Sequence, residues 1–332
     1  MNGKIMYSIV VPVYNRPAQI QELLESIQQQ ILPKPIPKFE VLITEDGSTQ
    51  DAGKEIQKYK THFPIQHIFS KTQKGPAQTR NYGASEAKGS YLIFVDSDVI
   101  LEKNYLSTLS EHLRKKKSPF LGGPDDILPE KASAWQKAVH HAMTSLWTTG
   151  GIRGGTQYQM ENFKPRTHNM CVLKNLFHKI GGFIPNLRYG EDIDFAIRME
   201  KKGYPGEYLP NLRIAHQRKS DKKSFFQQVY ASGQARRHLA HRHPGSTRWV
   251  HILPVMTVFS LIGLIIIGMV FSLKLFFGIS LGGVLILLGY GLIHGYSLHV
   301  AYLFVVATCI QILGYGLGFG LSYLHRKTSE KN

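Results

Sequence analysis

The sequence has 332 residues and a formal net charge of +17, with 40 Lys and Arg against 23 Asp and Glu. This length exceeds one small domain and is sufficient to bury a large core. A net positive charge of this size fits nucleic acid, an anionic membrane surface or a phosphorylated substrate as the partner. The distribution of the charge along the sequence has to distinguish among these three partners. The two cysteines, Cys171 and Cys309, lie far apart in sequence. They suggest neither a disulfide framework nor a metal cluster, which indicates a reducing compartment for the soluble part.

Residues 1–211 alternate between strand-like and helix-like segments. This alternation predicts an α/β fold, with a Rossmann-like, mainly parallel sheet that carries helices on both faces. Ligands of such sheets bind beyond the carboxyl ends of the strands. The predicted strands are Tyr7–Val13, Phe39–Thr44, Ile65–Phe69 and Tyr91–Val95, and the predicted helices are Ala18–Gln30, Asp51–Tyr59 and Pro76–Ala87.

Two aspartates, Asp96 and Asp98, follow the fourth predicted strand. Side chains two residues apart in extended chain point the same way, so these carboxylates lie close together. Neighbouring carboxylates repel unless a cation joins them, which predicts a divalent ion such as Mg²⁺ or Mn²⁺. The alternative is a turn in which one aspartate caps a helix.

Two further acidic segments lie where the same crevice is expected. Asp46 ends the second strand, where it either accepts hydrogen bonds from a nucleoside or shapes a turn. Glu191 and Asp192 begin a helix, and Asp192 is predicted to be a general base that takes a proton from an attacking hydroxyl. The alternative is that these acids only stabilise the helix N-terminus.

Three basic or histidine side chains are candidates for the same crevice. His216 follows the strand-like segment Leu212–Ala215 and is predicted as a third metal ligand or a phosphate contact, with a structural role as the alternative. Lys74 and Arg80 are predicted to contact a diphosphate or a nucleobase, and surface charge is their alternative reading. A glycine-rich loop is expected at Trp147–Tyr158.

The composition changes near residue 249, after which Lys274 is the only Lys, Arg, Asp or Glu up to Leu324. Val250–Phe271 and Leu298–Tyr323 each exceed the roughly 20 residues that span a bilayer, and Leu275–Ile293 is slightly shorter. Two or three transmembrane helices are therefore predicted, because a soluble helical bundle would need polar faces that these segments lack. Four glycines suit close helix packing: Gly314, Gly316, Gly318 and Gly320.

A basic segment precedes the apolar region: residues 212–248 contain nine Lys and Arg against Asp221. Aromatic and aliphatic residues interleave with these charges, which predicts an interfacial helix on anionic headgroups, the alternative being a solvated helix of the soluble domain. This location favours membrane lipids over nucleic acid. The positive-inside rule predicts an inner (plasma) membrane protein whose soluble domain faces the cytoplasm. The predicted parts are 1–217, the interfacial segment 218–248, the transmembrane helices 249–325 and the tail 326–332.

Four segments in order resemble a family 2 glycosyltransferase of the GT-A fold. The resemblance covers roughly residues 7–217 and implies transfer of a sugar from a nucleotide-activated donor, with inversion at the anomeric carbon. It resembles bacterial members that act in exopolysaccharide or lipid-linked oligosaccharide synthesis. The segments are SIVVPVYNR, EVLITEDGST, KGPAQTRNYGASEAKGSYLIFVDSDVI and KIGGF…YGEDIDFAIRMEKKGY.

The resemblance implies a role for each matching residue. Asp96 and Asp98 match the metal motif, which His216 is expected to complete. Glu191 and Asp192 are the expected catalytic residues, and Asp192 matches the catalytic base. On the acceptor side the expected residues are Asn169, Arg236 and Arg237. The predicted donor site consists of Pro12, Tyr14, Asn15, Asp46, Lys74, Arg80 and Ser97.

Two departures from the family pattern refine the prediction. Val99 stands where many members carry a further acid, and the Gln-x-x-Arg-Trp of processive synthases is not matched at Gln234–His238. The sequence therefore predicts metal-dependent transfer of a single sugar from a UDP- or GDP-linked donor to a lipid-linked or glycan acceptor. The alternatives are a polyprenyl-phosphate sugar synthase and a non-catalytic sugar-nucleotide-binding membrane protein. An oxidoreductase is disfavoured because the first strand–turn lacks Gly-x-Gly-x-x-Gly. The oligomeric state is not predicted.

Overall fold

The structure, a computed structural model, describes residues 6–34, 36–145, 148, 163–185, 187, 189–216, 218, 221–270 and 273–329. Contacts divide the chain into two compact units. The first unit is Met1–Ile127 with Gln157–Gln217, and the second is Leu128–Thr156 with Arg218–Asn332. Residues 128–156, which the sequence analysis assigns to the soluble domain, thus belong to the second unit. The glycine-rich loop expected at Trp147–Tyr158 lies outside the described residues, Thr148 excepted.

The first unit is built on a seven-stranded sheet of order β3-β2-β1-β4-β8-β6-β9. The four strands predicted from sequence pair in parallel, whereas β8 runs antiparallel to both β4 and β6. This confirms the predicted α/β fold with a mainly parallel sheet. The strands are β1 (Met6–Val13), β2 (Lys38–Asp46), β3 (Ile65–Ser70), β4 (Tyr91–Phe94), β6 (Phe120–Gly122), β8 (Met170–Leu173) and β9 (Glu207–Tyr208).

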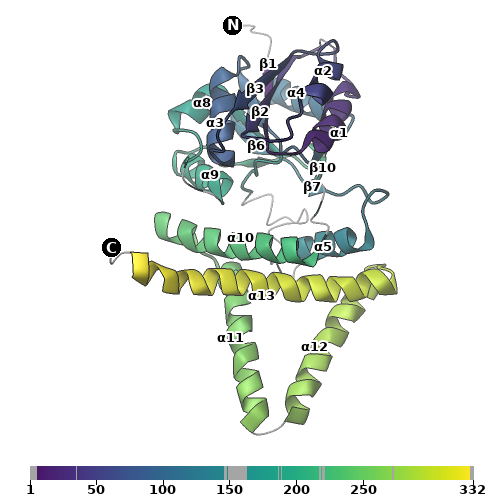
Figure 1. The fold of residues 1–332 in the computed structure, drawn as a ribbon, viewed down its shortest axis with the longest axis vertical. Coiled ribbons are helices and arrows are strands. Elements are labelled where there is room, and N and C mark those ends of the chain that lie inside the picture. The colour runs from purple at the N-terminus through teal and green to yellow at the C-terminus, as the bar shows by residue number, and fades with distance from the viewer. Residues whose placement is uncertain are drawn as a thin grey trace. The chain divides into compact units, whose positions relative to one another are not determined.

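Helices cover both faces of this sheet because apolar side chains on its strands alternate between two cores (Figure 1). Ile9 and Val11 face a core shared with helices α1, α2 and α4, and Val10 faces the core of α3, α8 and α9. The helices are α1 (Pro17–Gln28), α2 (Gly53–Tyr59), α4 (Tyr105–Lys115), α3 (Pro76–Glu86), α8 (Lys174–Lys179) and α9 (Glu191–Lys201).

A second, three-stranded sheet lies beside the end of β4. Strand β10 (Ile214–His216) runs antiparallel to β5 (Val99–Leu101) and parallel to β7 (Asp125–Asp126). In this register His216 is paired with Val99, the residue that follows Asp98. The small sheet therefore brings the histidine next to the aspartates that end β4.

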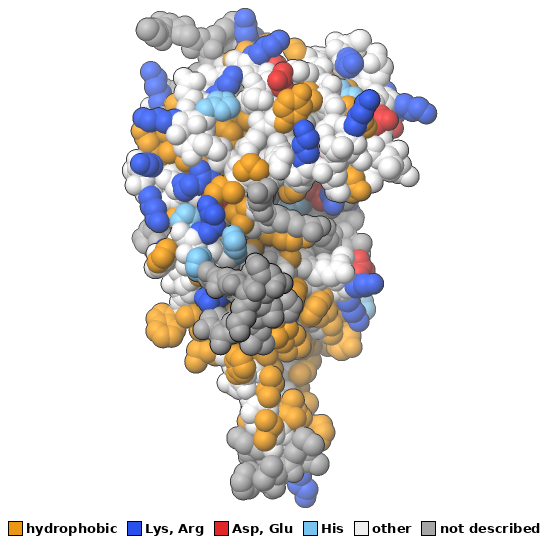
Figure 2. Space-filling view, turned by 60° about the vertical axis from the view of Figure 1, so that its left-hand side comes forward, with side chains coloured by type: hydrophobic (Ala, Val, Ile, Leu, Met, Phe, Trp, Pro, Cys, Tyr) orange, Lys and Arg blue, Asp and Glu red, His pale blue; other side chains and the backbone are white. Residues whose placement is uncertain are grey.

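The second unit is helical. Three of its helices are long and apolar enough to cross a membrane, in agreement with the prediction, over Trp249–Ile266, Phe276–Ile293 and Leu298–Ser322. Figure 1 shows α11 and α12 as a hairpin and α13 beside α10, and Figure 2 shows hydrophobic side chains dominating the surface of the hairpin. The helices are α5 (Ala134–Thr144), α10 (Lys222–Arg242), α11 (Trp249–Val270), α12 (Leu273–Ile293) and α13 (Leu298–Ser329).

Glycines of α13 allow neighbouring helices to approach its backbone closely. A Cβ atom on Gly318 would overlap the carbonyl oxygen of Tyr230 in α10, and one on Gly316 would lie 2.8 Å from the carbonyl oxygen of Pro254 in α11. Close packing is thus confirmed for these glycines. A Cβ atom on Gly320, by contrast, would meet nothing within 4 Å.

We expect Gly318→Ala to destabilise the second unit and Gly320→Ala to leave it unchanged or slightly more stable. The added methyl group must displace backbone at the first position, which costs about 1–3 kcal/mol, whereas alanine favours helix at the second. Thermal unfolding in detergent, followed by helical circular dichroism, gives the comparison. Equal midpoints for the two variants would contradict the close α10–α13 contact.

Candidate active site

Asp96, Asp98 and His216, the three predicted metal ligands, lie together in the first unit. Asp96 follows β4, Asp98 precedes β5 and His216 ends β10, so the sheet pairings position all three. Their candidate ligand atoms lie within 4.8 Å of one another. The His216 Nε2 atom is 3.3 Å from an Asp98 oxygen.

Asp98 has two basic side chains as partners. Arg16, at the start of α1, forms an ion pair with one carboxylate oxygen, and His216 faces the other. Although burial opposes ionisation, the His216 hydrogen bond and the Arg16 charge outweigh it, and the pKa of Asp98 lies well below its usual range. Asp98 is therefore held as a carboxylate, the form that binds a cation.

Arg80 is a buried cation shared by two acids. It lies on α3 with 5% exposure, and its guanidinium is 2.6 Å from Asp96 and 2.8 Å from Glu191. Burial lowers the pKa of Arg80, but the charges of Asp96 and Glu191 outweigh it and raise the pKa above its ordinary value. Arg80, predicted from sequence as a nucleotide contact, connects α3, the end of β4 and the start of α9.

The negative charge of Glu191 is only partly balanced by nearby positive charge. It is the first residue of α9 and 7% exposed, and its partner Arg80 already pairs with Asp96. Burial, together with the neighbouring charge of Asp192, raises the pKa of Glu191 to about 7 despite the opposing effect of Arg80. This carboxyl group therefore titrates near neutral pH.

Asp192, the predicted base, is the second residue of α9. One carboxylate oxygen accepts a hydrogen bond from the Ile193 N–H at 2.8 Å, and the other lies 3.5 Å from Arg166. The Asp192 side chain is 13% exposed, so it is accessible at the helix N-terminus. Arg166 was not among the predicted residues, since it lies in a segment without periodicity.

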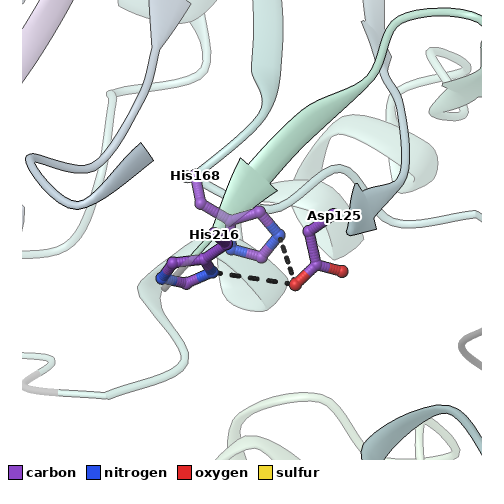
Figure 3. A group of neighbouring side chains, drawn as sticks. All are labelled: Asp125, His168 and His216. Carbon is purple, nitrogen blue, oxygen red and sulfur yellow. Dashed lines mark ion pairs between the residues drawn. The ribbon is translucent and has the colours of Figure 1, made fainter. Parts of the chain in front are cut away.

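A second group of side chains adjoins His216 (Figure 3). An oxygen of Asp125 on β7 lies 3.7 Å from His216 Nδ1 and 3.7 Å from His168 Nε2. The two imidazole rings are 5.2 Å apart between centroids. The Asp98 carboxylate thus faces one ring nitrogen of His216, and the Asp125 carboxylate lies near the other at a distance longer than a hydrogen bond.

Sequence reasoning missed Asp125 and His168. Strand β7 is only two residues long and His168 lies just before β8, so neither belongs to a recognisable motif. The pairing of β7 with β10, more than eighty residues away, is what brings Asp125 to His216. The only local signal is the Asp125-Asp126 pair itself.

Two of the predicted donor residues shape the loops at the strand ends. Asp46, 5% exposed, accepts hydrogen bonds from the backbone N–H groups of Lys74 and Gly75 at 2.7 and 2.9 Å. Asn15, at φ 51°, accepts hydrogen bonds from the N–H groups of Thr49 and Gln50 at 2.8 and 3.0 Å. These side chains fix the loops after β1, β2 and β3.

The other predicted donor residues differ in exposure. Pro12 lies within β1, paired with Thr44 of β2. Tyr14 is 44% exposed directly after that strand, and Ser97 is buried between the two aspartates. Tyr14 is therefore the predicted donor residue with an aromatic surface open for contact.

The three predicted acceptor residues belong to different units. Asn169 is 1% exposed; its side-chain oxygen accepts from the Tyr105 hydroxyl at 2.9 Å and its amide donates to the Leu212 carbonyl at 2.7 Å. It braces the core instead of facing solvent. Arg236 and Arg237 belong to α10 of the second unit, where Arg236 donates to Ser246.

The residues present fit a divalent cation. Carboxylate oxygens are suitable ligands for both Mg²⁺ and Mn²⁺, and a single imidazole among the ligands is compatible with Mn²⁺. Asp96, Asp98 and His216 offer such a set, partly exposed, within 4.8 Å. The neighbouring cations Arg16 and Arg80 balance the same carboxylates and would have to share them with an ion.

The fold and this site define the class of protein. The profile of the glycosyl transferase family 2 matches residues 8–188, more than half of the chain. The chain therefore belongs to this family of glycosyltransferases, as the sequence resemblance indicates.

Two relatives of known sequence are named as sugar transferases. An uncharacterized glycosyltransferase of Haemophilus influenzae is 28% identical over 219 residues, which is 58% of this chain and 62% of that protein. A dolichyl N-acetyl-alpha-D-glucosaminyl phosphate 3-beta-D-2,3-diacetamido-2,3-dideoxy-beta-D-glucuronosyltransferase of Methanococcus voltae is 25% identical over 269 residues, 79% of this chain and 82% of that protein. The chain thus spans less than two thirds of the first relative and most of the second.

A solved structure supports the fold. The mannosyltransferase PcManGT from Pyrobaculum calidifontis, in complex with GDP-Man and Mn²⁺, superposes with a TM-score of 0.64 at 16% identity. The superposition covers 94% of this chain and 88% of that one. At this identity the comparison establishes a shared fold.

We expect Glu191→Gln to flatten the dependence of stability on pH. A carboxyl group whose pKa rises from 4.5 to about 7 on folding stabilises the folded state fully below pH 4.5. That contribution is lost as the pH rises through 7, and it amounts to at most about 3 kcal/mol. Urea unfolding read by pulse proteolysis of the first unit, between pH 5 and 8 with chelator present, measures it.

The matched control is Glu200→Gln, which removes an acid from the same helix where the side chain is 49% exposed. Its stability should follow that of the unaltered chain at every pH. If Glu191→Gln showed the same slope as this control, the raised pKa of Glu191 would be refuted.

Proposed function

We propose that this protein is a membrane-associated, metal-dependent glycosyltransferase that moves one sugar, with inversion, from a nucleoside-diphosphate sugar to a lipid-linked or glycan acceptor. The observation that carries the proposal is the convergence of Asp96, Asp98 and His216 in a chain of this family. The apolar helices of the second unit support the membrane association. A plasma membrane with the first unit in the cytoplasm follows from the basic segment before α11.

In this proposal the aspartate cluster serves the leaving group. Asp96, Asp98 and His216 would hold a divalent cation, which would supply charge neutralisation for the diphosphate leaving group. Tyr14, Asp46 and Arg80 belong to the donor side, where Asp46 also fixes the loop that begins at Lys74. UDP and GDP are the proposed nucleotides, since UDP- and GDP-linked sugars are the donors expected from the sequence.

Asp192 is the proposed base. Its carboxylate at the N-terminus of α9 takes the proton of an acceptor hydroxyl as the oxygen attacks the anomeric carbon. Arg166, 3.5 Å away, and the Ile193 N–H orient this carboxylate. Glu191 acts behind it, through Arg80, and not on the substrate.

The acceptor separates the main proposal from its closest alternative. The Methanococcus voltae relative is named for transfer to a dolichyl-phosphate-linked sugar, which supports a lipid-linked acceptor with a sugar hydroxyl as nucleophile. A polyprenyl phosphate would itself supply an already ionised oxygen and need little base. The role of Asp192 therefore differs between the two.

We expect Asp96→Ala and Asp98→Ala to abolish the response to metal. Loss of a ligand should weaken Mn²⁺ binding by more than the roughly 10–100-fold seen for outer partners of metal ligands. Mn²⁺ titration by EPR, and thermal stabilisation by Mn²⁺ with UDP or GDP, provide the measurements. Transfer from radiolabelled nucleotide sugars into membrane acceptors tests turnover.

The control is Asp126→Ala, which removes an acid from the same small sheet where it pairs at the surface with Arg213. It should keep both metal binding and transfer. If no UDP- or GDP-sugar were turned over with membrane acceptors supplied, the enzyme proposal would be refuted. The protein would then be a non-catalytic sugar-nucleotide-binding membrane protein.

Asp192→Asn distinguishes the two acceptor classes. If a hydroxyl attacks, loss of the base should lower kcat by about 10²–10⁴-fold with Mn²⁺ binding unchanged. A polyprenyl-phosphate acceptor would instead be glycosylated at a rate reduced only severalfold. Steady-state rates with each acceptor in detergent, measured side by side, identify the class.

A further inference from the structure

Helix α13 is packed along the basic helix α10, although its composition resembles that of a membrane span. Gly314 meets Val229 and Phe226 of α10, Gly318 meets Tyr230, and the α10 residue Gly233 meets Phe319. Further toward its start, Phe304 and Ala307 share a buried cluster with Phe225 of α10 and Ala138 of α5. The contact thus involves α13 from about residue 304 to residue 319.

The charges on α10 oppose a transmembrane position for its partner. If α13 crossed a bilayer, the contact through Gly314 and Gly318 would carry α10 into the hydrocarbon with it. Each Lys or Arg at bilayer depth costs roughly 2.5–3.5 kcal/mol on insertion scales. The charged and histidine residues exposed on α10 are Lys222, Lys223, His238, His241 and Arg242.

The burial of α13 also differs from that of the hairpin helices. Within its apolar window 39% of residues are buried inside the structure, against 11% in α11 and 6% in α12. Its remaining surface includes an exposed apolar row at Tyr302, Cys309, Leu313 and Leu321. A helix covered on one side by α5 and α10 and apolar on the other fits the boundary between headgroups and acyl chains.

We propose that α13 lies in the plane of the membrane surface beside α10, that only α11 and α12 cross, and that anionic lipid headgroups are the partner of this helix pair. The inference rests on the proposal that the second unit is a membrane unit. Trp249, 80% exposed at the start of α11, occupies the position expected for an aromatic residue at the headgroup level.

The proposal has a topological consequence. Helix α10 ends at Arg242 and α11 begins at Trp249, so the chain enters α11 shortly after it leaves α10. With two crossings, α13 returns to the side from which α11 departed. Helices α10 and α13 therefore share one side of the membrane.

Depth measurements along α13 test the proposal. Spin labels on single cysteines at 302, 309, 313 and 321 are introduced into the full chain, using native Cys309 and a Cys309→Ser background for the others. Cys171 is fully buried and stays unlabelled. In vesicles of phosphatidylcholine with phosphatidylglycerol, EPR power saturation with oxygen and a nickel chelate should give four similar, shallow depths. A spanning α13 would spread residues 302 to 321 over roughly 28 Å, with the middle labels deepest.

Labels at Phe259 on α11 and Leu285 on α12 serve as the spanning controls, both being exposed apolar positions. If these two were accessible to the aqueous nickel chelate, the membrane association itself would fail. If they lay in hydrocarbon while the α13 labels crossed the bilayer centre, only the in-plane position of α13 would be overturned.

The lipid partner is tested on α10. A label at Gln227, exposed on that helix, should become more accessible to the nickel chelate when phosphatidylcholine replaces all phosphatidylglycerol. Lys222→Gln with Lys223→Gln should produce the same rise in anionic vesicles. Accessibility that is unchanged by lipid composition would exclude anionic headgroups as the partner.

Discussion

The geometry of the candidate site depends on one buried cation, Arg80. A buried charge is tolerated when partners with good geometry compensate it, and removal of a partner typically costs about 3–5 kcal/mol. Arg80 has such partners in Asp96 and Glu191, which come from the end of β4 and the start of α9. Helix α9 therefore has to start at this place against the sheet, and Asp192 is positioned as a consequence.

A second constraint acts on His216, whose ring lies between Asp98 and Asp125. Three very short strands contain or adjoin these residues, and such strands contribute little stability by themselves. Their pairing brings the imidazole of His216 to the end of β4. The first constraint acts on Asp96 and the second on Asp98. The same contacts therefore position the two aspartates and compensate their charge.

The sequence was sufficient to predict elements whose signal is local. The strands and helices up to β4 begin and end within two residues of their predicted bounds, because periodicity and turn residues determine them. The closeness of Asp96 and Asp98 was predicted from their spacing in extended chain, whereas His216 reaches them through the antiparallel pairing of β10 with β5, which the sequence did not predict. Arg16, Asp125 and His168 were missed because only long-range pairing brings them to the site. Asp46 and Asn15 were predicted to contact the donor, but the sequence did not predict that their side chains accept hydrogen bonds from N–H groups of neighbouring loops.

The helices of the second unit show what hydropathy measures and what it omits. An apolar window records that a segment avoids water, and α11, α12 and α13 all satisfy it. It does not record whether protein or lipid provides the apolar surroundings. In α13, Gly318 contacts the backbone of α10, whereas a side chain added at Gly320, two residues on, would meet no atom of the described residues within 4 Å. Residues of the same type thus acquire different roles from the partner helix, and that partner carries charges that a membrane interior would not accept.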